Sequence, residues 1–322
     1  MVSLVDCVYF LIPLSGYAIL TIFRKSFRET YLDIFLIILL SYVIGFFFFG
    51  YSLMILNVVI GISFSFMVQV LIYLSILISI IAFYYKLTTF LKSGISFKFS
   101  YDLVSLCLTF SYIAYIVKSI LVLSMEPIQD GDALYLWIPV GKVIYIMDGI
   151  PKFDSYHFFK FTEGPILPIF YAVYFTVKSD VHSEGFWTLP LIFLIAFPLL
   201  IFEFTKSYIN ERAAKIAALL YIALPGNDFL LYFYSYYPDM YNIFFGLCGI
   251  TFIAKLIFSR NTVNRLGLMV VSFSFTLSFL SKPYLGLILM FIAFGALIVS
   301  SNCLHKLFRI TLGAVFTMIV IY

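Results

Sequence analysis

Long apolar runs separated by short polar connections make up most of this chain. The runs cover residues 4–23, 31–51, 57–85 and 103–124, and then 186–205, 213–229, 239–257, 266–281 and 284–300. A helix needs about 20 apolar residues to cross the hydrocarbon core of a bilayer. Because only helices and closed barrels satisfy their backbone polar groups in lipid, the pattern predicts an all-α, multi-pass membrane protein of about nine or ten helices.

The two ends of the chain add expectations about topology. Arg24, Lys25 and Arg28 follow the first apolar run instead of preceding it. We therefore expect no cleavable signal peptide and an N-terminus outside the cytoplasm. The last apolar run begins at residue 310 and reaches Tyr322 after 13 residues, so the last helix is either partial or continues in a longer chain.

One apolar piece is too short to be a span. It runs from Gly164 to Val177 and contains Pro165 and Pro168. Since about 14 residues are fewer than a crossing needs, we expect a helix that lies at the outer membrane interface. This placement puts the basic connections on the cytoplasmic side, as the positive-inside rule requires. The longest polar stretch, residues 126–163, then lies outside.

Composition agrees with a membrane protein of one domain. Apolar residues make up 63% of the 322 positions and charged residues 11%, whereas about a quarter of a soluble domain is charged. We divide the chain into N-terminal transmembrane helices at residues 1–102 and a membrane core at residues 103–322, with an outer loop at 125–185. The lipid bilayer is the expected partner, and the small formal charge of +4 predicts no nucleic-acid partner.

Two acids open the polar stretch as Asp130-Gly131-Asp132. With glycine between them in a turn, both carboxylates can face one site, where one accepts a proton and the other orients a nucleophile or binds a cation. The alternative is that both are ordinary turn residues, with Asp132 capping the helix that starts at Ala133. The amphipathic run continues from there to Met147.

Further motifs follow the acidic pair in a fixed order. They are Gly164–Pro168 with its two prolines, the charged turn and alanine-rich span at 210–225, Pro238-Asp239, and a lysine-containing break at 280–287. Together with the acidic loop, they resemble the GT-C superfamily of glycosyltransferases that use polyprenyl-phosphate sugars, such as protein O-mannosyltransferases and lipid A aminoarabinose transferases. The resemblance covers roughly residues 103–300.

The resemblance implies a reaction at the outer membrane face. A sugar would pass from a polyprenyl or dolichyl phosphate to a hydroxyl group of a glycan, lipid or protein acceptor, by a single displacement with inversion. Asp132 is the expected general base and Asp130 the second choice. No metal is expected to be obligatory, although Asp130 and Asp132 can hold Mg²⁺ or Mn²⁺. Three additional N-terminal helices, a DxD pair where many relatives have DE, and the lack of a C-terminal extension leave the subfamily and its acceptor open.

A phosphate leaving group needs a positive partner in a dry site. The candidates are Lys282, at the outer end of its span, Lys118, about two turns inside the outer end of the fourth helix, and His157 and Lys160 in the outer loop. An ionisable side chain inside a membrane is a functional hypothesis by default. The alternatives are that both membrane lysines extend to the headgroups and that the loop residues are solvated.

Asp239 has two interpretations, a second acid facing the site or a helix-capping residue after Pro238. Other classes of function also stay open. A transporter or flippase would show inverted repeats and functional charges near the middle of the membrane, and neither is evident. An inactive subunit with the GT-C fold, or a ligase or polymerase of lipid-linked polymers, remains compatible with the sequence.

Overall fold

The computed structural model of the chain describes ten stretches of sequence. These are residues 4–23, 34–93, 102–125, 136–151, 164–181, 186–224, 238–258, 265–284, 286–288 and 290–291. Four of the seven predicted site residues, namely Asp130, Asp132, His157 and Lys160, lie outside them, as do most of the predicted spans at 284–300 and from 310 onward.

Every regular element in these stretches is a helix, which confirms the all-α prediction. The elements are η1 (Leu4–Phe10), α1 (Leu11–Phe23), α2 (Ile34–Met54), η3 (Ile55–Val59), α3 (Phe64–Ser93), α4 (Leu103–Met125), α5 (Ile138–Ile146), α6 (Ile166–Lys178), α7 (Thr188–Tyr208), α8 (Glu211–Ala223), α10 (Pro238–Phe258) and α11 (Arg265–Ser281).

Four helical segments in the described part are long and apolar enough to cross a membrane. They are Phe35–Val59, Phe64–Tyr85, Leu103–Met125 and Thr188–Tyr208. They indicate a membrane-embedded protein, while the count of nine or ten spans stays a prediction. Shorter apolar helices cover Cys7–Ile22, Ile166–Lys178 and Met269–Ser281.

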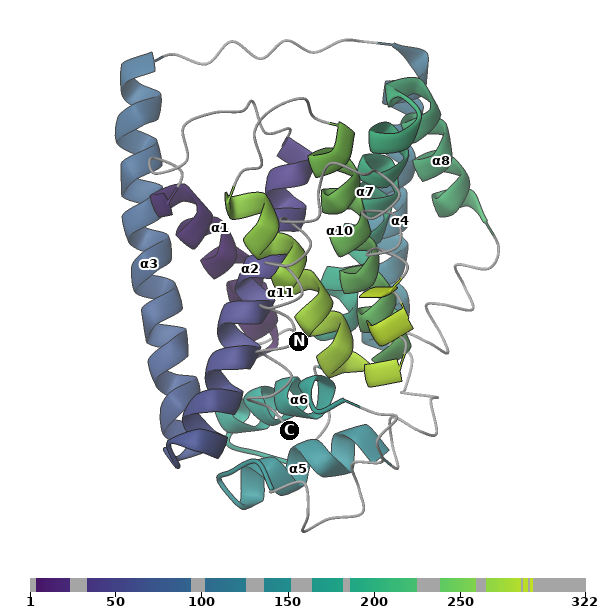
Figure 1. The fold of residues 1–322 in the computed structure, drawn as a ribbon. Coiled ribbons are helices and arrows are strands. Elements are labelled where there is room, and N and C mark those ends of the chain that lie inside the picture. Colours follow the sequence, from purple (N-terminus) through teal and green to yellow (C-terminus); the bar gives the residue numbers. More distant parts are fainter. Residues whose placement is uncertain are drawn as a thin grey trace.

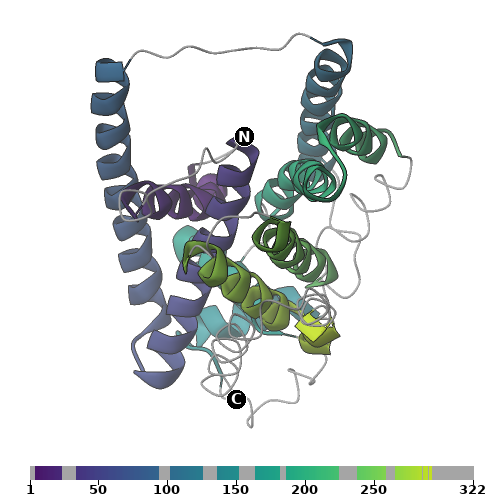
Figure 2. The ribbon, with the colours of Figure 1, turned by 45° about the horizontal axis from the view of Figure 1, so that its top comes forward.

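The long helices run side by side, with α3 and α4 on opposite outer sides of the bundle (Figures 1 and 2). Large apolar side chains on these two helices are exposed, including Tyr73 and Tyr84 on α3 and Phe110 on α4. The inner helices α2, α7 and α10 instead bury a cluster of rings that includes Phe46, Phe193, Phe244 and Phe245. The exposed faces are therefore the surfaces suited to hydrocarbon.

Two helices, α5 and α6, lie across one end of the bundle (Figure 1). The predicted interface helix at 164–177 is α6, and eleven of its thirteen side chains are buried, from Ile166 to Thr176. It is thus covered by protein, since α5 packs over it and η1, α2, α3 and α11 also contact it, while its place relative to the membrane stays a prediction. Gly141 of α5 permits this contact, since a Cβ there would come within 2.7 Å of the Tyr171 Cβ.

The predicted boundary between the second and third spans is wrong. The predicted third span begins at residue 57, but helical backbone of α2 and η3 continues to Val59 and α3 begins at Phe64. The turn lies at Gly61, whose φ of +77° is a conformation that glycine adopts readily. Because residues 52–63 contain no charged side chain, hydropathy alone could not locate this turn.

A close helix crossing joins α1 and α2 at two glycines. A Cβ added to Gly16 would lie 1.9 Å from the carbonyl oxygen of Ser41, and one added to Gly45 would lie 2.1 Å from that of Ile12. Small residues allow such backbone contact between membrane helices. Tyrosine hydroxyls add polar links in the core, as Tyr9 donates to the Phe170 carbonyl at 2.7 Å.

We expect Gly45→Ala to separate α1 from α2 and to cost at least about 1–3 kcal/mol, the usual range for overpacking. Gly50→Ala, on the same helix α2, is the matched control. A Cβ at Gly50 would first meet the ends of the flexible Ile166 and Phe170 side chains of α6. The melting temperature of each variant is measured in detergent, with size-exclusion chromatography monitoring the loss of folded protein on heating. Equal melting temperatures for the two would contradict the close crossing.

Candidate functional site

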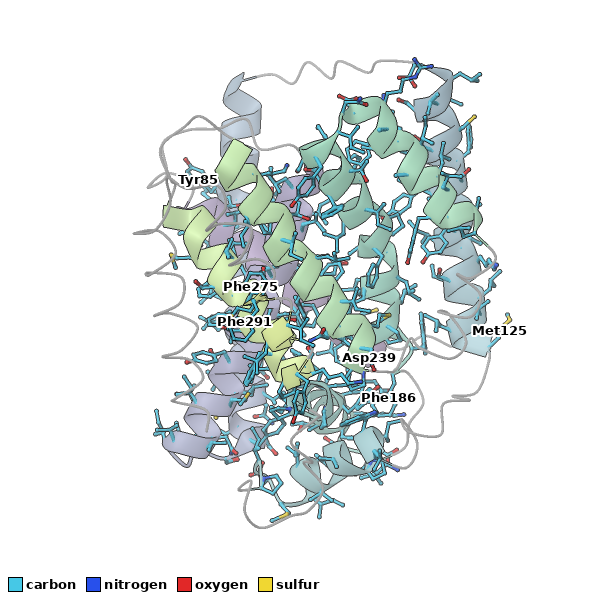
Figure 3. All side chains as sticks on the ribbon, turned by 45° about the vertical axis from the view of Figure 1, so that its right-hand side comes forward. Tyr85, Met125, Phe186, Asp239, Phe275 and Phe291 are labelled. Carbon is cyan, nitrogen blue, oxygen red and sulfur yellow. The ribbon has the colours of Figure 1, made fainter. Side chains whose placement is uncertain are left out.

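Two of the predicted site residues form an ion pair. The Lys282 Nζ donates to Oδ1 of Asp239 at 2.7 Å and to Oδ2 at 2.8 Å. The two side chains are 30% and 26% exposed, respectively. Asp239 lies in the first turn of α10 and Lys282 directly follows α11. Figure 3 shows Asp239 at the end of the bundle where α5 and α6 lie.

Helix electrostatics explain why these residue types stand at these positions. The first turn of a helix carries partial positive charge and the last turn partial negative charge. Asp239 follows Pro238 at the start of α10, and Lys282 follows the end of α11. The two helices are antiparallel neighbours, so each charge complements its own helix and also meets the opposite charge. The favourable interaction with the helix dipole and the ion pair therefore act together at Asp239.

A buried asparagine joins the same two helix ends. Asn242 is one turn after Asp239, and its Nδ2 donates to the carbonyls of Ser278 at 2.7 Å and Lys282 at 3.1 Å. The Ser278 carbonyl lies in the last turn of α11 and the Lys282 carbonyl directly after it, and both also accept backbone N–H groups, from Lys282 at 3.0 Å and from Gly286 at 2.9 Å. The Ser278 hydroxyl returns a bond to the Asn242 carbonyl at 3.2 Å. Asn242 Oδ1 is buried and has no hydrogen-bond partner among the described residues.

The start of α6 meets the end of α11 through Gly164. Its backbone N–H donates to the Ser281 carbonyl at 3.1 Å, and a Cβ would lie 1.7 Å from the Leu280 carbonyl oxygen. Only glycine fits such an approach. The structure therefore brings together two motifs that lie far apart in the sequence, the Gly164–Pro168 piece and the break at 280–287. Lys282 stands at that break, as helical backbone resumes at residues 283–284.

Lys118, the other described lysine candidate, occupies a different position. It is exposed on α4, while the neighbouring Ser119 and Tyr115 are buried. This helix packs mainly on α7 and α8. Lys118 thus lies on the surface of the bundle, on a helix that does not form the α10–α11 junction.

Other polar groups were not assigned a role by the sequence. Asp148, at the end of α5, accepts hydrogen bonds from Ser63 and Ser65. Glu203 of α7 is fully buried and pairs with Lys255 of α10 near the opposite end of the bundle. The sequence signal for the Glu203–Lys255 pair is one acid and one base, each alone inside an apolar run. Such residues in membrane segments generally indicate function or pairing. Asn242 carried a similar signal.

Comparison of the chain with protein-family models, curated proteins and solved structures finds no match. The GT-C resemblance consequently stays a hypothesis that depends on the motifs themselves. Binding of a divalent cation by Asp130 and Asp132 also stays a prediction, because both lie outside the described residues.

We expect the Asp239–Lys282 pair to be energetically coupled. Asp239→Asn or Lys282→Met alone leaves a partly buried charge without its partner. Each single variant should therefore lose more than half of the free energy of unfolding that the double variant loses. Their coupling energy should fall in the range of about 0.5–3 kcal/mol, measured by thermal unfolding of both single variants and the double variant. A control cycle on Lys215 and the half-exposed Asp102, which pair at 2.8 Å, should give a smaller coupling energy, because exposed ion pairs are screened by solvent. Strict additivity at Asp239 and Lys282 would contradict the coupling.

Proposed function

We propose that the protein is a GT-C-like glycosyltransferase that moves a sugar from a polyprenyl or dolichyl phosphate to a hydroxyl acceptor outside the cytoplasm. The observation that carries the proposal is the position of Lys282. Its ammonium group bonds to Asp239, which lies at the end of the bundle where α5 and α6 cover the helices (Figure 3). The described part of α4 ends at Met125 and the chain is described again just before α5, and Asp130 and Asp132 lie between these two points in the sequence.

Lys282 retains capacity for a phosphate. An ammonium group has three donors, and two of them point to the carboxylate oxygens of Asp239. The third donor is available to an oxygen of a lipid phosphate, since the lysine side chain is 30% exposed. Asp239 holds the ammonium group in place before the donor arrives. Such a preorganised charge is the usual means of stabilising a leaving phosphate.

The charge distribution supports an extracytoplasmic site. The C-terminal ends of α3 and α7 and the N-terminal ends of α2, α4 and α11 point away from α5 and α6 (Figure 1). Basic residues cluster in or beside the corresponding connections: Arg24, Lys25, Arg28, Lys98, Lys206, Arg212, Lys215, Arg260 and Arg265. The positive-inside rule places that end in the cytoplasm and the Asp239–Lys282 pair outside.

The proposed transfer is a single displacement between the lipid-linked sugar and the acceptor hydroxyl, with an aspartate taking up the proton. The acceptor oxygen attacks the anomeric carbon as the bond from that carbon to the phosphate oxygen breaks, and the phosphate leaves with the electron pair. The acceptor proton passes to Asp132, with Asp130 as the orienting acid. His157 and Lys160 supply further contacts to the phosphate. A single displacement inverts the configuration at the sugar.

Positions of the buried charges weigh against transport. A flippase is expected to hold its functional charges near the middle of the membrane. Glu203 is five residues before the end of α7, a rise of about 7.5 Å at 1.5 Å per residue. The Glu203–Lys255 and Asp239–Lys282 ion pairs therefore lie toward the ends of the described helices.

The decisive experiment is sugar transfer from a radiolabelled polyprenyl-phosphate sugar by the purified protein in lipid vesicles. We expect Asp132→Asn to lower kcat by about 100-fold or more, the usual contribution of a general base. Lys282→Met should lower it by about 100-fold, and Lys282→Arg should recover part of the loss because it restores the positive charge. Lys178→Met, which removes a lysine that packs over the Tyr174 ring of α6, should leave transfer unchanged.

Each failure has a separate meaning. Equal transfer by wild type and Asp132→Asn would remove Asp132 from the mechanism and leave Asp130 or Asp239 as the base. No transfer by the wild type, across several donor sugars and acceptors, would overturn the proposed function and favour a transporter or an inactive subunit.

A further inference from the structure

A dense set of hydrogen bonds joins the end of α5 to the turn between α2 and α3. The carboxylate of Asp148 accepts bonds from the hydroxyls of Ser63 and Ser65, and from the Ser65 backbone N–H at 2.6 Å. The Asp148 carbonyl accepts from the Phe64 N–H at 3.0 Å. Asp148 thus caps the N-terminus of α3, although 83 residues separate it from Ser65 in sequence.

Asn57 also joins the α2–α3 turn to the residues that follow α5. Its Nδ2 donates to the Ile62 carbonyl, and its Oδ1 accepts from the Ile150 backbone N–H, each at 2.7 Å. The side chain therefore bonds both to its own turn and to the residue before Pro151. We call the group formed by Asn57, Ser63, Ser65, Asp148 and Ile150 the clasp.

The backbone at Asp148 is shaped for this contact. Its φ is +50°, in the left-handed region that aspartate tolerates better than most residues. Burial on its own would raise the pKa of the carboxyl group, but the hydrogen bonds from Ser63 and Ser65 outweigh it, and the pKa of Asp148 is lowered. A lowered pKa means that the carboxylate's contribution is present above the usual pKa of about 3.9 and is lost only as the pH falls through the lower folded value.

The clasp lies at the C-terminal end of the described piece of the outer loop that contains α5. Between Met125 and Gly164, the described backbone is residues 136–151, which contain α5. The segment with Asp130 and Asp132 enters this piece, and the segment with His157 and Lys160 leaves it one residue after Ile150, at Pro151. Two anchors hold the piece: the Gly141 contact with α6 and the clasp.

We infer that the α2–α3 turn positions the outer loop through Asp148, and that Asp148 is a positioning residue for the proposed sugar transfer. The part that concerns transfer rests on the proposed function. The additional N-terminal helices, which depart from the GT-C pattern, thereby gain a role. They hold the end of α5 and with it Ile150, directly before the point at which the chain continues toward His157 and Lys160.

Two variants break the clasp from opposite sides. Asp148→Gly removes the carboxylate and tolerates the positive φ, whereas Ser63→Ala with Ser65→Ala removes the hydroxyl donors without changing α5. Asp148→Asn is the conservative variant, because its side-chain oxygen still accepts from the Ser65 N–H and asparagine tolerates the same backbone. Asp102→Asn is the matched control: Asp102 caps α4 through the Ser105 N–H and does not touch the clasp.

Hydrogen–deuterium exchange in lipid nanodiscs measures the clasp without catalysis. The N–H groups of Phe64, Ser65 and Ile150 are bonded across the junction, so both clasp-breaking variants should speed exchange about tenfold or more in residues 57–66 and in residues 144–151. The decisive signal is faster exchange at 144–151 in the Ser63→Ala, Ser65→Ala variant. A cap that serves α3 alone would change only residues 57–66, and that result would overturn the inference. Asp102→Asn should change neither segment.

Sugar transfer tests the consequence for function. Both clasp-breaking variants should lower kcat about tenfold or more, because misplacing a catalytic group by about 1 Å can lower the rate roughly 100-fold. Asp148→Asn should retain most of the wild-type kcat. Unchanged kinetics in variants with faster exchange would overturn the positioning role. A wild type without transfer overturns the proposed function instead, and the exchange result at residues 144–151 then decides the inference by itself.

Discussion

Backbone polar groups at helix ends need partners, and in a bilayer there is no water in the hydrocarbon core to supply them. Much of the polar chemistry in the described part of this chain meets that need. Gly164 donates to the Ser281 carbonyl at the end of α11, Asp148 receives the first N–H groups of α3, and Asn242 adds a second hydrogen bond to the Ser278 carbonyl of α11. The positions of the polar side chains follow from where helices stop, and the Asp239–Lys282 pair is built on the same junction.

This constraint also explains what the sequence could predict. Apolar runs predicted α4 almost to the residue, since residues 103–124 correspond to Leu103–Met125, and placed α7 and α10 within a few residues. The short length and the prolines of α6 correctly set it apart from the spans. The turn at Gly61 was missed because its surroundings are as apolar as the helices on either side.

Prediction of the site was limited by distance along the chain. Asp239 and Lys282 were both named, but 43 residues separate them and no periodic pattern links residues on different helices. The lone Asn242 in an apolar helix was a signal that went unassigned. Asp148 precedes Gly149 in a polar loop, where an aspartate ordinarily indicates a turn, so its bonds to α3 had no counterpart in local sequence. Pairing of this kind depends on how helices assemble, which hydropathy does not encode.

The glycine crossing of α1 and α2 has a consequence for biosynthesis. The α-helical part of α1 is thirteen residues long, short of the roughly 20 that a crossing needs, whereas α2 with η3 contains a segment of 25 apolar residues. Because the contact at Gly16 and Gly45 needs both helices, α1 cannot reach its final packing before α2 has been synthesised. A chain that stops between the two helices would lack this contact.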